Sequence, residues 1–191
     1  MDFHTLCIGC RTYRRFKQKQ IPEEILDELL ENARIANSAM NGQPLRYVLV
    51  KTSEAVRKIQ PCFHFAAALP KELGQPKEGE QPTAFIILCT EGPETPWTGI
   101  DIGIAVRTMN LNAYIHGVGS CIIGNVEFEK VKEILSIPET WIPRLALALG
   151  YPSHKSSLVE LPEDGSIKYY LDEERQYYVP KRKQEDISII R

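Results

Sequence analysis

The chain has 191 residues, 43% of them hydrophobic and 25% charged, and its formal net charge is −2. This length supports one sizeable core and is short for two, so we expect a single domain over residues 1–191. The balanced charge excludes a strong field for binding nucleic acid, and no apolar run approaches the roughly 20 residues of a membrane helix, so we expect a cytoplasmic protein.

Five cysteines are scattered along the chain, which indicates reduced thiols rather than a disulfide scaffold. The motif Cys7-Ile-Gly-Cys10 is compatible with a metal or dithiol site. However, no second pair of cysteines or histidines completes four metal ligands, and no strand precedes the motif as in a thioredoxin-like site. We therefore expect no metal site and interpret the motif as two incidental cysteines on a short helix.

The first half of the chain predicts helices and strands in alternation. Pro22 and two glutamates begin a segment with helical apolar spacing, which predicts an amphipathic helix over residues 22–36. The continuously apolar stretch 84–90 predicts a central strand that is covered on both faces. Between these, we expect a loop over 37–44, a strand over 46–51, a short helix over 53–60 and a polar surface loop over 70–81.

In the second half, residues 98–116 predict a helix that is apolar on nearly every side, as in a core or a subunit interface. Gly117 suits its C-terminal cap. Residues 153–191 are too polar to form a core alone, so we expect them to pack along another surface. A short apolar segment over 120–123, a helix over 127–136 and a strand over 143–149 complete the pattern.

Two polar segments and one glycine-rich segment are candidates for a site. Residues 117–124, GVGSCIIG, follow a helix and not a strand, which excludes a Rossmann dinucleotide site. The glycines are either plain turn residues or let backbone N–H groups approach a planar ligand. The polar residues are either solvated or form a clamp for a phosphate and a polar ring. These polar residues are Arg11, Thr12, Arg14 and Arg15 in one segment and Ser38, Asn41 and Gln43 in the other.

The same segments fit a series of motifs in order. Asp2-Phe3, Leu6, Arg11-Thr12, Arg14 and Phe16 fit the pattern DFxxLxxxRRSxRxF, residues 33–44 fit AxxAPSAxNxQPW, and residues 117–124 fit GLGSxxxG. Residues 149–152 and 179–182 fit a late strand and a tail. In this order and spacing, nearly the whole chain resembles the FMN-dependent nitroreductase family of NAD(P)H-dependent flavin oxidoreductases. It departs from the pattern at Cys10, Asn37 and Leu45, where the family commonly has Arg, Pro and Trp.

The resemblance implies an α+β sandwich whose mainly antiparallel sheet is flanked by helices, in an intertwined homodimer with FMN at the interface. Residues 153–191 would be a C-terminal arm that packs on the partner subunit. The implied enzyme passes hydride from NADH or NADPH to the flavin N5, and then electrons to a small organic acceptor such as a nitroaromatic or a quinone, by a ping-pong mechanism.

The resemblance also implies a role for particular residues. Arg14 would be catalytic, because it would stabilise negative charge at the N1 and O2 edge of the reduced flavin. Cys10 removes a cation, for which Lys181 and Arg182 would compensate. Arg11, Thr12, Lys181 and Arg182 would hold the phosphate or ribityl chain, Ser38, Asn41 and Gln43 would line the ring and ribityl, and the backbone of Ile122, Ile123 and Gly124 would address the N5 and O4 edge.

Two alternatives stay open. One is an FMN-binding protein with little turnover, acting as a sensor or carrier. The other is a specialised flavin reaction, such as reductive dehalogenation or flavin destruction, because one fold hosts several reactions. The sequence also leaves open the physiological acceptor and the choice between NADH and NADPH.

Overall fold

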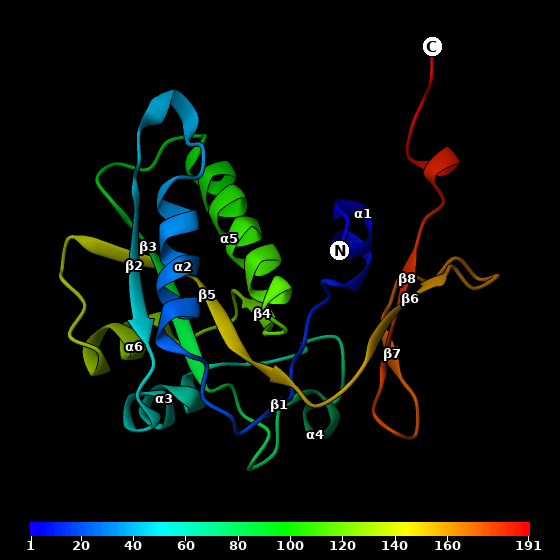
Figure 1. Cartoon of the computed structure of the whole chain (residues 1–191), viewed down its shortest axis with the longest axis horizontal. Helices are drawn as coiled ribbons and strands as arrows, with labels where there is room; N and C mark the ends of the chain where they lie inside the picture. Colours follow the sequence, from blue (N-terminus) through cyan, green and yellow to red (C-terminus); the bar gives the residue numbers. More distant parts are fainter.

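The centre of the molecule is a five-stranded sheet in which every strand pairing is antiparallel (Figure 1). The computed structural model describes residues 1–191, apart from the side chain of Lys71. The strands run in the order β1-β5-β3-β2, and β4 also pairs with β5. Their bounds are β1 (Phe16–Lys17), β2 (Leu45–Val50), β3 (Ala84–Glu91), β4 (Gly119–Ile123) and β5 (Trp141–Pro152).

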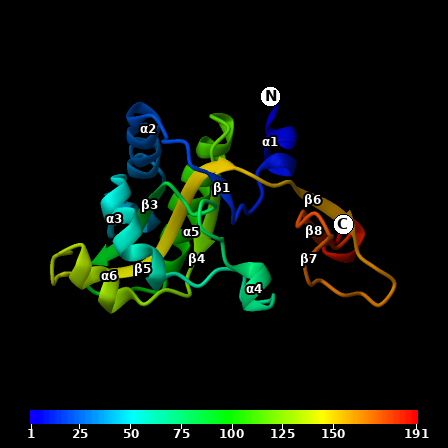
Figure 2. The ribbon, with the colours of Figure 1, turned by 90° about the horizontal axis from the view of Figure 1, so that it is seen from below.

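Helices cover both faces of this sheet, which explains why β3 is continuously apolar. Successive side chains of a strand point to opposite faces, and in β3 Phe85 and Ile87 pack with one pair of helices while Ile86 and Leu88 pack with the other. Figure 2 shows these two layers on either side of the strands. The structure confirms the predicted α+β sandwich. The first pair is α3 (Ser53–Ile59) and α6 (Phe128–Ile134), and the second is α2 (Glu23–Arg34) and α5 (Thr98–Ile115).

Gly117 takes part in the C-terminal cap of helix α5, as predicted, and its φ of 71° is the left-handed conformation that favours glycine. The N–H of Gly117 donates to the carbonyl of Tyr114, and the N–H of Val118 donates to the carbonyl of Ala113. This pair of bonds is a Schellman motif, which satisfies the last carbonyls of the helix. The cap turns the chain directly into β4, so the end of α5 lies beside the start of that strand.

The outer side of α5 is apolar and exposed. Met109 and Ala113 are fully buried against the sheet, whereas Ile100, Ile104 and Ile115 are exposed on the same helix. This distribution explains the nearly uniform apolar character of residues 98–116. Several large apolar side chains along one exposed face are typical of a surface that binds another protein.

Residues 153–191 form a small separate sheet beside the main one (Figures 1 and 2). Its middle strand, β8 (Tyr177–Lys181), pairs in parallel with β6 (Ser156–Glu160) and antiparallel with β7 (Tyr170–Leu171). Tyr177 is almost fully buried where this sheet meets the N-terminal segment, and Arg175 forms an ion pair with Glu80 of the body. We call residues 153–191 the arm.

Some short elements were not predicted from the sequence. Phe16–Lys17 forms β1 on the end of β5, which was not predicted because a two-residue strand has no periodicity. The expected loop over 70–81 contains a one-turn helix, and the short apolar segment expected over 120–123 belongs to strand β4. The remaining short elements are α1 (Phe3–Gly9), α4 (Lys71–Gly74) and the 3₁₀ turns η1 (Ala39–Asn41), η2 (Gln60–Cys62) and η3 (Gln184–Asp186).

Candidate functional site

The basic N-terminal segment lies directly against β4. Thr12 forms a parallel bridge with Ser120, and the N–H of Tyr13 donates to the Ser120 carbonyl at 2.9 Å. A side chain at Gly119 would place its Cβ 2.8 Å from the Tyr13 ring, so only glycine permits this approach. The structure therefore brings Arg11, Thr12 and Arg14 to the strand that contains Ile122 and Ile123 and leads into Gly124.

Several arginines near this contact have no acidic partner. None of the ion pairs between described residues includes Arg11, Arg14 or Arg107. The Nε atoms of Arg11 and Arg14 are buried without a hydrogen-bond partner. A buried donor without an acceptor costs about 1–3 kcal/mol, so an anionic oxygen bound here would relieve that cost. The arrangement fits a phosphate or another anion.

Side chains of the arm orient Arg14. Its guanidinium carbon lies 4.6 Å from the ring centre of Tyr169 and 4.9 Å from that of Tyr177, which are favourable distances for cation–π contacts. The backbone N–H of Arg14 donates to Nε2 of His154 at 3.0 Å. Stacking holds the Arg14 guanidinium but leaves its charge free, because aromatic rings carry no formal charge.

His154 is buried and neutral. Its Nδ1 lies 2.9 Å from the Lys155 carbonyl, and the neutral tautomer with a proton on Nδ1 satisfies both ring nitrogens. Burial, together with the charges of Arg15 and Arg14, lowers the pKa of His154 to about 4. The histidine is therefore a structural link between the arm and the basic segment and not a proton donor at neutral pH.

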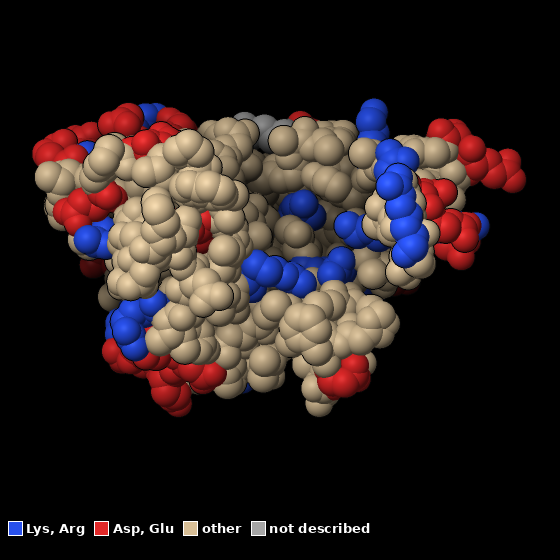
Figure 3. Space-filling view, turned by 90° about the horizontal axis from the view of Figure 1, so that it is seen from above, with Lys and Arg blue, Asp and Glu red and all other residues tan. Residues whose placement is uncertain are grey.

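Figure 3 shows a hollow between the body and the arm, with Lys and Arg side chains on its walls. This local concentration of basic side chains contrasts with the formal net charge of −2. Positive charges around a concave surface favour the binding of an anionic ligand.

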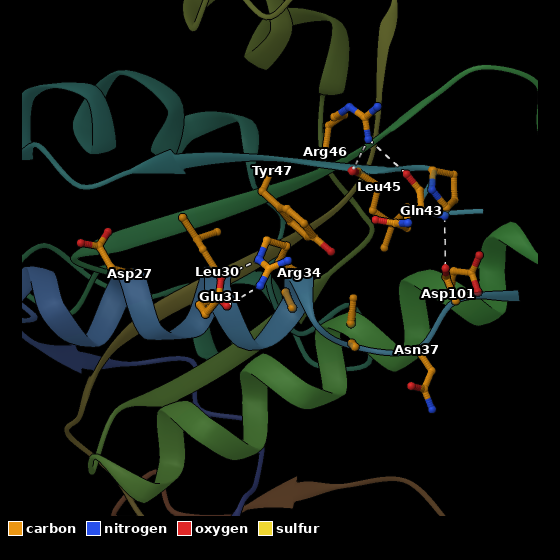
Figure 4. Close-up of a pocket in the computed structure, with 15 residues that line it drawn as sticks. Asp27, Leu30, Glu31, Arg34, Asn37, Gln43, Leu45, Arg46, Tyr47 and Asp101 are labelled. Carbon is orange, nitrogen blue, oxygen red and sulfur yellow. Dashed lines mark hydrogen bonds and ion pairs between the residues drawn. The ribbon is translucent and has the colours of Figure 1, made fainter. Parts of the chain in front are cut away.

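A second cavity lies at the other end of α5, between the end of α2, the start of β2 and α5 itself (Figure 4). Its volume is about 490 Å³. Asp101 of α5 accepts a hydrogen bond from the Ala39 N–H at 2.8 Å, and the Ser38 hydroxyl accepts one from the Gln43 N–H at 3.1 Å. Asn41 and Gln43 have φ values of 54° and 45°, a strained conformation that often accompanies function.

The predicted site residues thus fall into three separate groups. The basic segment meets α5 at Asn110, and the loop with Ser38 meets the same helix at Asp101. These two points are more than two helical turns apart, about 13 Å along the axis. The third group, Lys181 and Arg182, is exposed at the end of β8 in the arm. Ser38, Asn41 and Gln43 therefore do not meet Arg11, Thr12 and Arg14 within one protomer.

Some residues at this site were missed from sequence. Tyr169, Tyr177 and His154 stand in the polar arm, where no pattern distinguishes them. By contrast, Arg107 and Asn110 are polar residues in the most apolar helix of the chain, and that exception was a usable signal.

The cysteines beside the site are thiols and not nucleophiles. Burial raises the pKa of Cys121 to about 11 and also raises the pKa of Cys10. Because only the thiolate is a good nucleophile, neither side chain is reactive at neutral pH.

Among the described residues, no three His, Cys, Asp or Glu side chains are gathered so that they could hold a metal ion. No helix in the described chain has both the length and the hydropathy needed to span a membrane.

The chain is similar in sequence to known nitroreductases and flavin reductases. Residues 9–151 match the nitroreductase family. A protein of Methanothermobacter thermautotrophicus, provisionally named NADH dehydrogenase/NAD(P)H nitroreductase, is 28% identical over 79% of this chain and 78% of its own length. A Bacillus subtilis protein named FMN reductase [NAD(P)H] is 26% identical over 77% of this chain and 64% of its own length.

Solved structures share the fold. A nitroreductase family protein from Clostridium difficile superposes with a TM-score of 0.65 over 80% of this chain and 86% of its own, at 23% identity. An FMN-dependent nitroreductase from the same organism gives a TM-score of 0.63 over 80% of this chain and 91% of its own, at 21% identity.

Proposed function

Because the chain belongs to the nitroreductase family, we propose that it is an FMN-dependent oxidoreductase that passes electrons from NADH or NADPH to a small organic acceptor. Nitroaromatics and quinones are the proposed acceptors, in a ping-pong sequence. One observation carries this proposal. Arg11 and Arg14, which have no acidic partner among the described residues, lie in the segment that bridges to β4 through Thr12 and Ser120. An activity that depends on NAD(P)H also suits the cytoplasm.

The chain's own residues supply binding and electrostatics, while FMN, when bound, supplies the redox chemistry. Arg14 is the proposed catalytic residue. Its charge is unpaired, and its contacts with the rings of Tyr169 and Tyr177 hold it in place, so it can stabilise negative charge on a neighbouring ring at little cost in reorganisation.

Phosphate and ribityl binding is assigned to Arg11, Thr12, Lys181 and Arg182, because forked and charged donors suit phosphate oxygens. The backbone N–H groups of Ile122, Ile123 and Gly124 are proposed to bind one edge of the ring. Ser38, Asn41 and Gln43 are proposed to line the ring and ribityl from the other side.

We further propose a homodimer in which each site is completed by two protomers. The loop with Ser38 and the basic segment are about 13 Å apart along α5, and the exposed apolar side of that helix lies between them. Burial of Ile100, Ile104 and Ile115 against a second copy would bring the loop of one chain to the basic segment of the other. Residues 1–191 would then act as one domain, with residues 153–191 as the arm that packs on the partner.

The test is an anaerobic absorption spectrum of the purified protein, recorded before and after one equivalent of NADH or NADPH. We expect flavin bands that bleach on mixing, and the faster donor identifies the preferred nucleotide. Flavin bands that persist with both donors would favour a binding protein with little turnover. A colourless protein that takes up no FMN would contradict the proposed function.

A further inference from the structure

Arg107 projects from α5 into the polar contact between the N-terminal segment and β4. Its Nη1 donates to Oδ1 of Asn110 at 2.5 Å and lies 3.6 Å from the Cys10 sulfur. The Cys10 thiol donates to the same Asn110 oxygen at 3.0 Å, and the Asn110 amide donates to the Ser120 hydroxyl at 2.5 Å. One buried amide therefore fixes Arg107 beside Cys10 and beside Ser120, the strand partner of Thr12.

The charge of Arg107 is not neutralised by its surroundings. Burial raises the pKa of Cys10, so its sulfur is a protonated thiol and not a thiolate. No described carboxylate pairs with Arg107, and its Nε and Nη2 form no hydrogen bond with a described residue. The side chain is only partly buried, so these donors can reach a ligand.

A second cation stands at the same place. Arg11 lies close enough to the Cys10 sulfur to oppose the rise in its pKa, as Arg107 does, and its Nε is buried without a partner. Among the described residues, Arg11 donates only to the neutral carbonyl of Cys7, and neither arginine has an acidic partner. An anion bound to both guanidinium groups would offset their mutual repulsion.

We infer that Arg107 binds the phosphate group of the flavin mononucleotide, and that it supplies from α5 the cation that residue 10 does not provide. This inference rests on the proposed function, because it assigns a residue to the cofactor site proposed above. It makes Arg107 a binding residue that distinguishes FMN from riboflavin. The opposing interpretation is that Arg107 only ties α1, α5 and β4 together.

Equilibrium binding separates the two interpretations. Full-length apoprotein is titrated with FMN and with riboflavin, which differ only in the phosphate, and flavin fluorescence reports the dissociation constants. Loss of one charge-assisted bond in Arg107→Gln should weaken FMN binding about 10- to 100-fold, and riboflavin binding by less than about twofold. Arg57→Gln, which removes an exposed arginine of α3, is the matched control and should change neither constant.

A second substitution tests the position itself. Cys10→Arg in the Arg107→Gln background should restore the preference for FMN over riboflavin, because the new guanidinium enters the same contact. Should Arg107→Gln not fold, Arg107→Lys takes its place, since lysine keeps the charge without the fork. Arg107→Lys should weaken the binding of FMN and leave the binding of riboflavin unchanged.

Equal weakening of FMN and riboflavin would show a purely structural role and overturn the inference. Unchanged FMN binding in Arg107→Gln would overturn it as well. Each of these results leaves the proposed function intact. Wild-type apoprotein that binds neither flavin would instead refute the proposed function.

Discussion

Arg14 combines a fixed position with an unpaired charge. Tyr169 and Tyr177 stack on its guanidinium, and the His154 ring accepts its backbone N–H. A carboxylate that holds an arginine in place also cancels its charge. Here the charge is available to a ligand, and that is why we assign it the catalytic role.

Replacement of this side chain should change the redox behaviour of the bound flavin. Arg14→Ala removes positive charge next to the ring, so it should lower the flavin reduction potential and slow reduction by NAD(P)H about 10- to 100-fold. Potentiometric titration and anaerobic stopped-flow absorption measure the two effects. Arg14→Lys keeps the charge, so its reduction potential and reduction rate should lie between those of the wild type and Arg14→Ala. An unchanged potential and rate in Arg14→Ala would remove Arg14 from this role.

The link between the arm and the body should depend on pH through His154. The neutral ring accepts the Arg14 N–H, and Tyr13, Tyr177, Arg15 and Arg175 surround it. Its pKa is about 4 in the folded chain, against an ordinary value of 6.5 for histidine, so the unfolded chain binds the extra proton first as the pH falls. The free energy of unfolding should be highest above about pH 6.5 and fall by about 3 kcal/mol between pH 6.5 and 4.

Urea denaturation at a series of pH values measures this effect. Carboxylates also titrate in that range, so the informative quantity is the difference between the wild type and His154→Gln. Glutamine does not bind a proton in this range, so the free energy of unfolding of His154→Gln should fall less steeply with decreasing pH than that of the wild type. Parallel curves for the two proteins would mean that His154 does not titrate as its buried setting requires.

At the scale of single residues, sequence predicts what has a motif and misses what depends on the fold. Arg14 and Thr12 were identified because they belong to a pattern with fixed spacing. Arg107 comes from another part of the chain and reaches Cys10 across 97 positions, so only the packing of α5 on α1 reveals their contact. The burial of His154 arises in the same way, from the return of the arm to the N-terminal segment.

At the scale of elements, the predictions succeeded where periodicity and burial agree. β3 was identified as a central strand because both of its faces are covered, and α2 because its apolar residues lie on one side. Helix α5 was predicted with the right bounds to within one residue, and its lack of a polar side is explained by packing on the sheet and an exposed apolar face. Elements of one turn or two residues, such as α4 and β1, are set by tertiary contacts and carry no such pattern.

In the whole molecule, one chain keeps the two larger groups of proposed flavin-binding residues apart, and each group is an incomplete part of the proposed site. The basic segment and β4 form one part, and the loop with Ser38, Asn41 and Gln43 forms the other at the far end of α5. Closed twofold symmetry is the common arrangement of protein dimers, and it would join the two parts twice in one assembly. In such a dimer, each flavin would be bound by residues of both protomers.

Complementation between two inactive variants tests whether the site is shared between protomers. One variant carries Arg14→Ala, and the other carries Ser38→Ala, Asn41→Ala and Gln43→Ala together. Both are co-expressed with different affinity tags, and the NAD(P)H-dependent reduction of a quinone is measured. Each variant alone should have little activity, whereas random pairing makes half of the dimers mixed, each with one intact site, so the mixture should recover about a quarter of wild-type activity. Activity no higher than the average of the two parent variants would contradict a site shared between protomers.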